Sequence, residues 1–142
     1  WSAINKSSQL LLNDFDIRAP DINTPVAALS GGNQQKVVVG RELAVKCKLL
    51  IASQPTRGVD FASAISIQQT IIEASQYGTS VLLISSDLDE LLKISDRIMV
   101  LLRGNIVGII SAKNADRKIL GRMMLGIEVD TEPESLAGDC LR

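Results

Sequence analysis

Apolar residues recur at two different spacings in this sequence, and the two spacings predict alternating helices and strands. Spacings of three and four residues predict helices over 3–14, 33–45 and 62–76, each with one buried face. Two continuous apolar runs, 49–52 and 80–85, instead predict short strands that are covered on both faces, as in a parallel sheet. A strand, a helix and a second strand in this order predict a βαβ unit.

The later part of the chain predicts a hairpin between two helices. A short helix over 88–93 precedes two apolar segments, 97–102 and 105–110, which are joined by a glycine-containing turn. A last helix is expected over 116–125, with Gly126 as its C-cap.

Two segments show neither spacing. Residues 15–28 contain Pro20 and Pro25 among polar residues, which predicts an extended linker. Residues 128–142 are polar and acidic, and we expect this tail to be poorly ordered. The order of elements therefore predicts an α/β fold in one layered domain.

Composition narrows the classes of function. The chain has 142 residues, of which 46% are apolar and 22% charged, as in an ordinary soluble domain. A net charge of −1 and only 3% aromatic residues argue against nucleic-acid binding by charge or by base stacking. Histidine is absent, which removes the commonest general base and the usual zinc ligand. Cys47 and Cys140 form no metal-binding motif, so two reduced thiols are expected.

The ends of the sequence carry a separate set of expectations. No apolar run is long enough to cross a bilayer, and the first residues do not resemble a signal peptide. The sequence begins with Trp1 in place of an initiator Met, which suggests a piece of something longer.

The residues with the most specific chemistry stand immediately before the helix at 33–45. Ser30 can cap this helix through its hydroxyl, and Gly31 and Gly32 have no Cβ to hold another backbone or a ligand away. Unpaired N–H groups and the helix dipole make such an end attractive to an anion. The alternative is an ordinary Ser-Gly-Gly turn that does no more than cap the helix.

The segment Leu29–Lys36, with the sequence LSGGNQQK, resembles the signature sequence of ATP-binding-cassette (ABC) proteins. Its NQQK extension is similar to that of the subgroup that powers uptake of simple sugars and nucleosides. The strand at 49–52 and the segment Pro55–Asp60 stand where this family has its Walker B strand and its D-loop. Residues 85–87 stand at the position of its switch loop, and order and spacing agree over about residues 15–125.

This resemblance implies an α/β fold that is a partial P-loop NTPase fold of the ABC type, with a mainly parallel sheet flanked by helices and a late β-hairpin. It also implies three parts. Residues 1–28 would be the end of a helical subdomain and a linker, 29–126 the C-terminal part of the ATPase core, and 127–142 a disordered polar tail.

The P-loop motif of the family, GxxxxGK[ST], is missing. The only GxxxxG, Gly121–Gly126, is followed by Ile127 and Glu128 and lies in a predicted helix, so we expect a packed helix end there. The glutamine loop that precedes the family's signature is absent as well. The sequence thus looks like the C-terminal half of a cassette, and it is not expected to hydrolyse ATP alone.

Three further positions depart from the catalytic residues that the resemblance implies. The family ends its Walker B strand with Asp, which helps to hold Mg²⁺, and Glu, which orients or deprotonates the attacking water; here these positions are Ser53 and Gln54. Serine has no charge for a divalent ion, and glutamine cannot accept a proton. Ser86 replaces the switch-loop histidine that contacts the γ-phosphate. We therefore expect a degenerate catalytic site with no metal ligands.

The signature serves a different site. In this family two cassettes pack head to tail, and each signature closes over the nucleotide that the other holds. The residues expected to contact ATP bound by a partner cassette are Ser30, Gly31, Gly32 and Asn33. Asp60 is expected at the seam between the two cassettes; its alternative role, compatible with the first, is to cap the helix at 62–76.

The resemblance as a whole implies the second, decayed cassette of an importer's ATP-binding protein. Its partners would be a first nucleotide-binding domain in the same polypeptide and transmembrane permease subunits, with no nucleic acid. ATP and Mg²⁺ would be present in the complete assembly and absent from the isolated chain. The protein would lie at the cytoplasmic face of the cell membrane, and an uncovered sheet edge makes self-association a further expectation.

Two other classes of function remain open at this point. A cassette protein of translation or DNA maintenance shares the signature, although such proteins usually keep their catalytic carboxylates. A doubly wound binding module, in which the Ser-Gly-Gly turn is incidental, would hold its ligand at the carboxyl ends of its strands.

Overall fold

The computed structural model describes residues 2–45 and 47–127 and divides the chain into two compact units. The first unit ends at Ser85 and the second begins at Ser86. From residue 128 on, the tail that the sequence predicts to be disordered lies outside the described residues, as does Cys140. Cys47 is a free, half-buried thiol.

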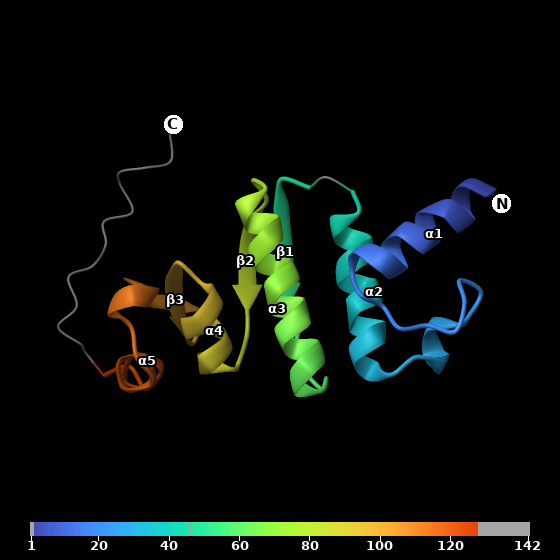
Figure 1. Ribbon diagram of the computed structural model, residues 1–142. Helices are drawn as coiled ribbons and strands as arrows, with labels where there is room; N and C mark the ends of the chain where they lie inside the picture. The colour runs from blue at the N-terminus through green and yellow to red at the C-terminus, as the bar shows by residue number, and fades with distance from the viewer. Residues whose placement is uncertain (1, 46, 128–142) are drawn as a thin grey trace. The chain divides into compact units, whose positions relative to one another are not determined.

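The first unit contains a parallel pair of strands and the longest of the described helices (Figure 1). Its elements are, in chain order, α1 (Ser2–Asp14), the 3₁₀ helix η1 (Val26–Ala28), α2 (Gly31–Leu43), β1 (Leu49–Ser53), α3 (Phe61–Gln76) and β2 (Ser80–Ile84). The predicted βαβ order is confirmed, because β1 and β2 pair in parallel and α3 connects them.

The two faces of the β1–β2 pair differ in burial. Leu50 and Ala52 point to the covered face and are buried, and α3 contacts β2. The alternate positions form the other face, where four large apolar side chains are exposed: Leu49, Ile51, Leu82 and Ile84. The prediction that both faces are covered is therefore wrong within the first unit, whose described helices leave this face exposed.

The segment 15–28 is less extended than the sequence predicts, because it packs against α2. Ile17 is buried. Phe15 packs closely on Gly40, because a Cβ added to this glycine would lie only 2.8 Å from the Phe15 ring. The ammonium of Lys36 donates to the backbone carbonyl of Asp16 at 2.9 Å and to its carboxylate at 3.0 Å. The two prolines thus break the helical pattern without releasing the segment from the fold.

The second unit is a β-hairpin covered by short helices. Its elements are α4 (Leu88–Ile94), β3 (Arg97–Leu102), β4 (Asn105–Ser111), the 3₁₀ helix η2 (Ala112–Asn114) and α5 (Arg117–Met124). Leu102 pairs with Asn105, which leaves Arg103 and Gly104 as a two-residue turn. Both turn residues have positive φ angles, 49° and 82°, as a hairpin turn of this length requires. The predicted hairpin is confirmed.

The core of this unit lies between the hairpin and α5. Its buried residues are Ile98, Val100, Ile110, Leu120 and Met123. The helix ends as predicted, because Gly126 has a φ of 72° and donates to the carbonyl of Met123 at 2.9 Å. Gly121 lies inside α5, so the isolated GxxxxG is a helix end and not a phosphate-binding loop. None of the described helices combines the length and the apolar character needed to span a membrane.

Candidate functional site

Ser30 is the N-cap of α2 and the first of the candidate site residues along the chain. It has an extended backbone, with φ −62° and ψ 155°, and its hydroxyl oxygen accepts from the backbone N–H of Asn33 at 3.4 Å. Ser30 and Gly31 are exposed. Gly31 and Gly32 supply the first backbone N–H groups of the helix, which have no carbonyl partner within it. We call residues 30–33 the signature turn.

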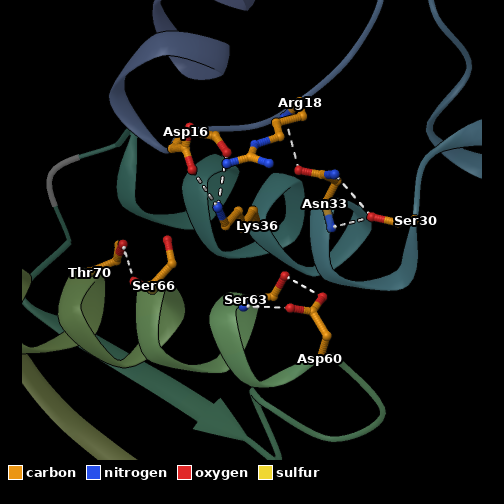
Figure 2. Close-up of polar contacts among 9 residues, drawn as sticks. All are labelled: Asp16, Arg18, Ser30, Asn33, Lys36, Asp60, Ser63, Ser66 and Thr70. Carbon is orange, nitrogen blue, oxygen red and sulfur yellow. Dashed lines mark hydrogen bonds and ion pairs between the residues drawn. The ribbon is translucent and has the colours of Figure 1, made fainter.

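Asn33 links this turn to the preceding segment through its side-chain amide (Figure 2). Its Nδ2 donates to the Ser30 hydroxyl oxygen at 2.9 Å, while its Oδ1 accepts from the backbone N–H of Arg18 at 2.9 Å. Asn33 is half-buried. The side chain therefore connects the cap of α2 to a residue 15 positions earlier in the chain.

Gly32 is buried where the signature turn meets the start of α3. A Cβ at this position would lie 2.1 Å from the hydroxyl oxygen of Ser63 and 3.0 Å from a carboxylate oxygen of Asp60. Only a residue without a side chain fits this contact. Gly32 thus has a packing role that the sequence did not reveal, whereas a Cβ on Gly31 would meet the Gly58 carbonyl at an ordinary 3.6 Å.

Asp60 caps α3, as its alternative role predicted. Its carboxylate accepts from the backbone N–H of Ser63 at 3.0 Å and from the Ser63 hydroxyl at 2.7 Å. These hydrogen bonds from Ser63 lower the pKa of Asp60 below its ordinary value. The role of Asp60 at a seam between cassettes stays a prediction.

Ser63 is a residue that sequence reasoning missed. It holds the Asp60 carboxylate with its hydroxyl and lies against Gly32, so it joins the segment Pro55–Asp60 to the signature turn. The available signal was the spacing of an Asp followed three residues later by a hydroxyl residue at the start of a helical pattern. That spacing indicates a cap, but it does not indicate what packs on the cap.

Ser53 and Gln54 lie at the carboxyl end of the parallel strands. Ser53 is the last residue of β1, and Gln54 follows with a φ of 50°, in the left-handed region. The backbone N–H of Gln54 donates to the carbonyl of Ile84, the last residue of β2, at 2.7 Å. Ser86 comes two residues after β2 and opens the second unit.

The residues at this strand end do not fit a Mg²⁺ ion. Ser53 and Gln54 have no carboxylate, and Mg²⁺ sites in proteins depend on carboxylate oxygens. Across residues 2–45 and 47–127, no three side chains of His, Cys, Asp or Glu gather in a possible metal site.

Several relatives by sequence are named for the import of nucleosides or sugars. The chain is 40% identical over 121 residues to the guanosine import ATP-binding protein NupO of Bacillus subtilis. This match covers 85% of the chain and 24% of that protein. It is 41% identical to the nucleoside import ATP-binding protein NupA of Lactococcus lactis, and this match covers 89% of the chain and 25% of that protein. It is 35% identical to the galactose/methyl galactoside import ATP-binding protein MglA of Escherichia coli, and this match covers 86% of the chain and 24% of that protein. No protein-family model matches the chain.

Solved structures show the same fold. The ATP-binding cassette MJ0796, in a dimeric post-hydrolysis state bound to ADP and Pi, has a TM-score of 0.67 and 25% identity, and the match covers 75% of this chain and 46% of that one. A metal-chelate type ABC transporter matches in fold with a TM-score of 0.72 at 18% identity, over 85% of this chain and 48% of that one.

The chain spans about a quarter of the length of the curated relatives that it matches and about half of the solved cassettes. The relatives are named as import proteins, which favours the importer interpretation over a cassette protein of translation or DNA maintenance. The fold match and the identity over most of the chain also argue against an incidental Ser-Gly-Gly turn. The chain belongs to the ABC ATPase family, as a partial cassette of the type found in sugar and nucleoside import ATP-binding proteins.

Proposed function

We propose that this chain is the C-terminal half of the second cassette in the ATP-binding subunit of an importer of simple sugars or nucleosides. In this role the signature turn contacts ATP that is bound by a partner cassette, and the chain's own catalytic site is degenerate. The sequence relatives support the importer class, since those compared above are named as guanosine, nucleoside or galactose import proteins.

The observation that carries the proposal is the exposure of hydrogen-bond donors at the signature turn. Ser30 and Gly31 face solvent at the start of α2, where the first N–H groups of the helix are directed outward. Donors at a helix N-terminus stabilise a phosphate oxygen, and the helix dipole adds to this. The Ser30 hydroxyl and the Gly31 N–H would bind the terminal phosphate. Gly32 and Asn33 hold the turn in shape.

The second part of the proposal concerns the strand end at Ser53 and Gln54. A glutamine side chain can orient a water but cannot take its proton, so this half would not activate water at its own site. Ser86 stands in the sequence where the family has its switch-loop histidine, so a third catalytic group of the family is missing as well. The chain therefore acts on a partner's nucleotide and not on one of its own.

The partners follow from the same role. They are a first nucleotide-binding domain in the same polypeptide and a transmembrane permease, which place the protein at the cytoplasmic face of the membrane. ATP and its Mg²⁺ belong to the complete assembly, in which ATP hydrolysis supplies the free energy for transport. Asp60, one residue before α3, lies next to the signature turn and would face the seam between the cassettes.

The test is Ser30→Arg in the complete importer. An arginine places bulk and charge where the phosphate oxygen should approach, so ATP turnover and transport should fall at least about tenfold, the factor that ~1.4 kcal/mol of lost stabilisation gives. Ser75→Arg, on the exposed end of α3, is the matched control and should leave both rates unchanged. Unchanged transport in Ser30→Arg would exclude the contact with the partner's nucleotide.

Restoring the catalytic residues tests the degenerate site. The triple variant Ser53→Asp, Gln54→Glu and Ser86→His returns the carboxylates and the imidazole to these three sequence positions. ATP hydrolysis by the complete protein should rise if these three positions account for the loss. No rise would show that the decay extends beyond them and would contradict this part of the proposal.

A further inference from the structure

We propose that Asn33 is a positioning residue that turns the hydroxyl proton of Ser30 outward, toward the ligand. This inference rests on the proposed contact between the signature turn and a nucleotide phosphate, and adds a residue and a mechanism to it. The contacts that carry it are shown in Figure 2.

The Ser30 hydroxyl has only its proton left for a further hydrogen bond. A hydroxyl has two acceptor lone pairs and one donor proton. The oxygen accepts from Nδ2 of Asn33 at 2.9 Å and from the backbone N–H of Asn33 at 3.4 Å. Both lone pairs are therefore directed at Asn33, and the remaining capacity of the hydroxyl is to donate its proton.

The backbone of Arg18 fixes the orientation of the Asn33 amide, whose oxygen and nitrogen have nearly the same shape. The backbone N–H of Arg18 lies 2.9 Å from Oδ1 and can only donate, so it requires the amide oxygen on that side. The NH₂ group must then face Ser30. The Arg18 backbone thus selects the one amide orientation in which Asn33 donates to the Ser30 oxygen.

The backbone that leads to Arg18 is itself held by α2. Asp16, two residues earlier, has a φ of 47°, in the left-handed region that favours glycine. The buried Lys36 holds it there by donating to its carbonyl and its carboxylate, at 2.9 Å and 3.0 Å. Lys36 stands one helical turn after Asn33 in α2, so the same helix fixes the segment that orients the Asn33 amide.

A hydroxyl that can only donate suits an oxygen of an anion and rejects a donor ligand. Hydrogen bonds to a charged acceptor are about twice as strong as those between neutral groups. The ligand class comes from the membership of the ABC ATPase family, whose relatives are named as ATP-binding proteins. In this arrangement the Ser30 O–H donates to the terminal phosphate, and Asn33 sets the direction of that O–H bond.

The experiment is a double-mutant cycle on ATP hydrolysis by the complete importer, with the variants Ser30→Ala, Asn33→Asp and both together. Asn33→Asp keeps an oxygen for the Arg18 N–H but cannot donate to Ser30, so the hydroxyl proton turns inward, toward the new carboxylate. A carboxylate near a helix N-terminus should not harm folding. We expect kcat to fall at least about tenfold in Asn33→Asp and less than about twofold when the same change is made in Ser30→Ala.

The outcomes separate the role of Asn33 from the contact between Ser30 and the nucleotide. An equal fall in both backgrounds would show that Asn33 acts through its charge, through folding or by touching the nucleotide itself, and would overturn the inference. A fall in Ser30→Ala with no effect of Asn33→Asp would also overturn it while leaving the proposed function intact. No effect of Ser30→Ala would remove the proposed function and the inference together. If the Asn33→Asp assembly does not form, Asn33→Ala in the same cycle gives the same comparison.

Discussion

Gly32 shows how one missing side chain sets the distance between two functional segments. Ser63 and Asp60 occupy the space that a Cβ would need, with the Ser63 hydroxyl oxygen 2.1 Å from its ideal position. The glycine therefore lets the signature turn approach the cap of α3 closely. Its place in the signature can be read from the sequence, but its packing partner cannot, because Ser63 is remote in the chain.

The first prediction concerns this contact. Gly32→Ala should lower the free energy of unfolding by about 1–3 kcal/mol, as overpacking of a tight contact usually does. Ser63→Gly removes both Ser63 side-chain atoms that the new methyl would meet, so the double variant should regain most of the loss. Denaturant unfolding measures both. Additive losses in the double variant would contradict the contact.

Three carboxylates make the fold sensitive to acid. The pKa of Asp16 is lowered by Lys36, that of Asp60 by Ser63, and that of Asp89 by the guanidinium of Arg117, all from an ordinary value of 3.8. Because each folded-state pKa lies below the unfolded one, ionisation stabilises the fold above about pH 4. This stabilisation is lost as the pH falls through the unfolded and then the folded values.

The second prediction is that the melting temperature drops between about pH 5 and about pH 3. Circular dichroism followed on heating would show it. A variant with Asp16→Asn, Asp60→Asn and Asp89→Asn should melt lower at neutral pH but lose less on acidification. An equally steep loss in this variant would assign the acid sensitivity to other groups.

Among the elements, α2 is the one that organises the first unit. Its N-terminus forms the signature turn, Gly40 receives the Phe15 ring, and the buried Lys36 holds Asp16. A periodic pattern predicts that α2 exists and where it lies. It does not predict that a lysine on its buried face bonds to a backbone carbonyl 20 residues away.

The third prediction tests that bond. Lys36→Met keeps most of the side-chain volume but leaves the Asp16 carbonyl and carboxylate without their donor, which should cost about 1–3 kcal/mol of unfolding free energy. Lys48→Met, at an exposed position outside the helices, is the matched control and should change it by less than about 0.5 kcal/mol. Chemical denaturation of the three chains side by side decides, and equal stabilities would rule out a stabilising role for Lys36.

For the complete chain, the most consequential feature is the uncovered face of the β1–β2 pair. Leu49, Ile51, Leu82 and Ile84 are 44–61% exposed there, next to each other in register. Adjacent apolar side chains on an open sheet face favour association with another surface. The sequence predicts self-association through an uncovered sheet edge. These four exposed side chains on the sheet face are the better explanation for it.

The fourth prediction is that the isolated 142-residue chain forms dimers or larger species through this face. Ile51→Lys with Leu82→Lys should shift it toward the monomer, because two charges in the patch oppose its burial. Light scattering after gel filtration measures the mass. As a control, the same charges at Tyr77 and Phe61, which are exposed outside this face, should leave the association unchanged.

Local rules account for what the order of residues revealed. The caps by Ser30 and Asp60, the Arg103–Gly104 turn and the end of α5 at Gly126 involve residues within about four positions of each other. Such interactions depend on neighbours in the chain, so the helices, the strands, the hairpin and the signature could be placed before any fold was known.

The packing of distant segments could not be read in this way. The Asn33–Arg18 and Lys36–Asp16 bonds join residues 15 and 20 positions apart, and the Gly32–Ser63 contact joins two helices. The open face of the strands likewise depends on which helices cover them, which an apolar run alone does not state. These contacts form only when the chain folds. Folding brings together residues that are far apart in the sequence, and the residue types alone do not identify which of them will be in contact.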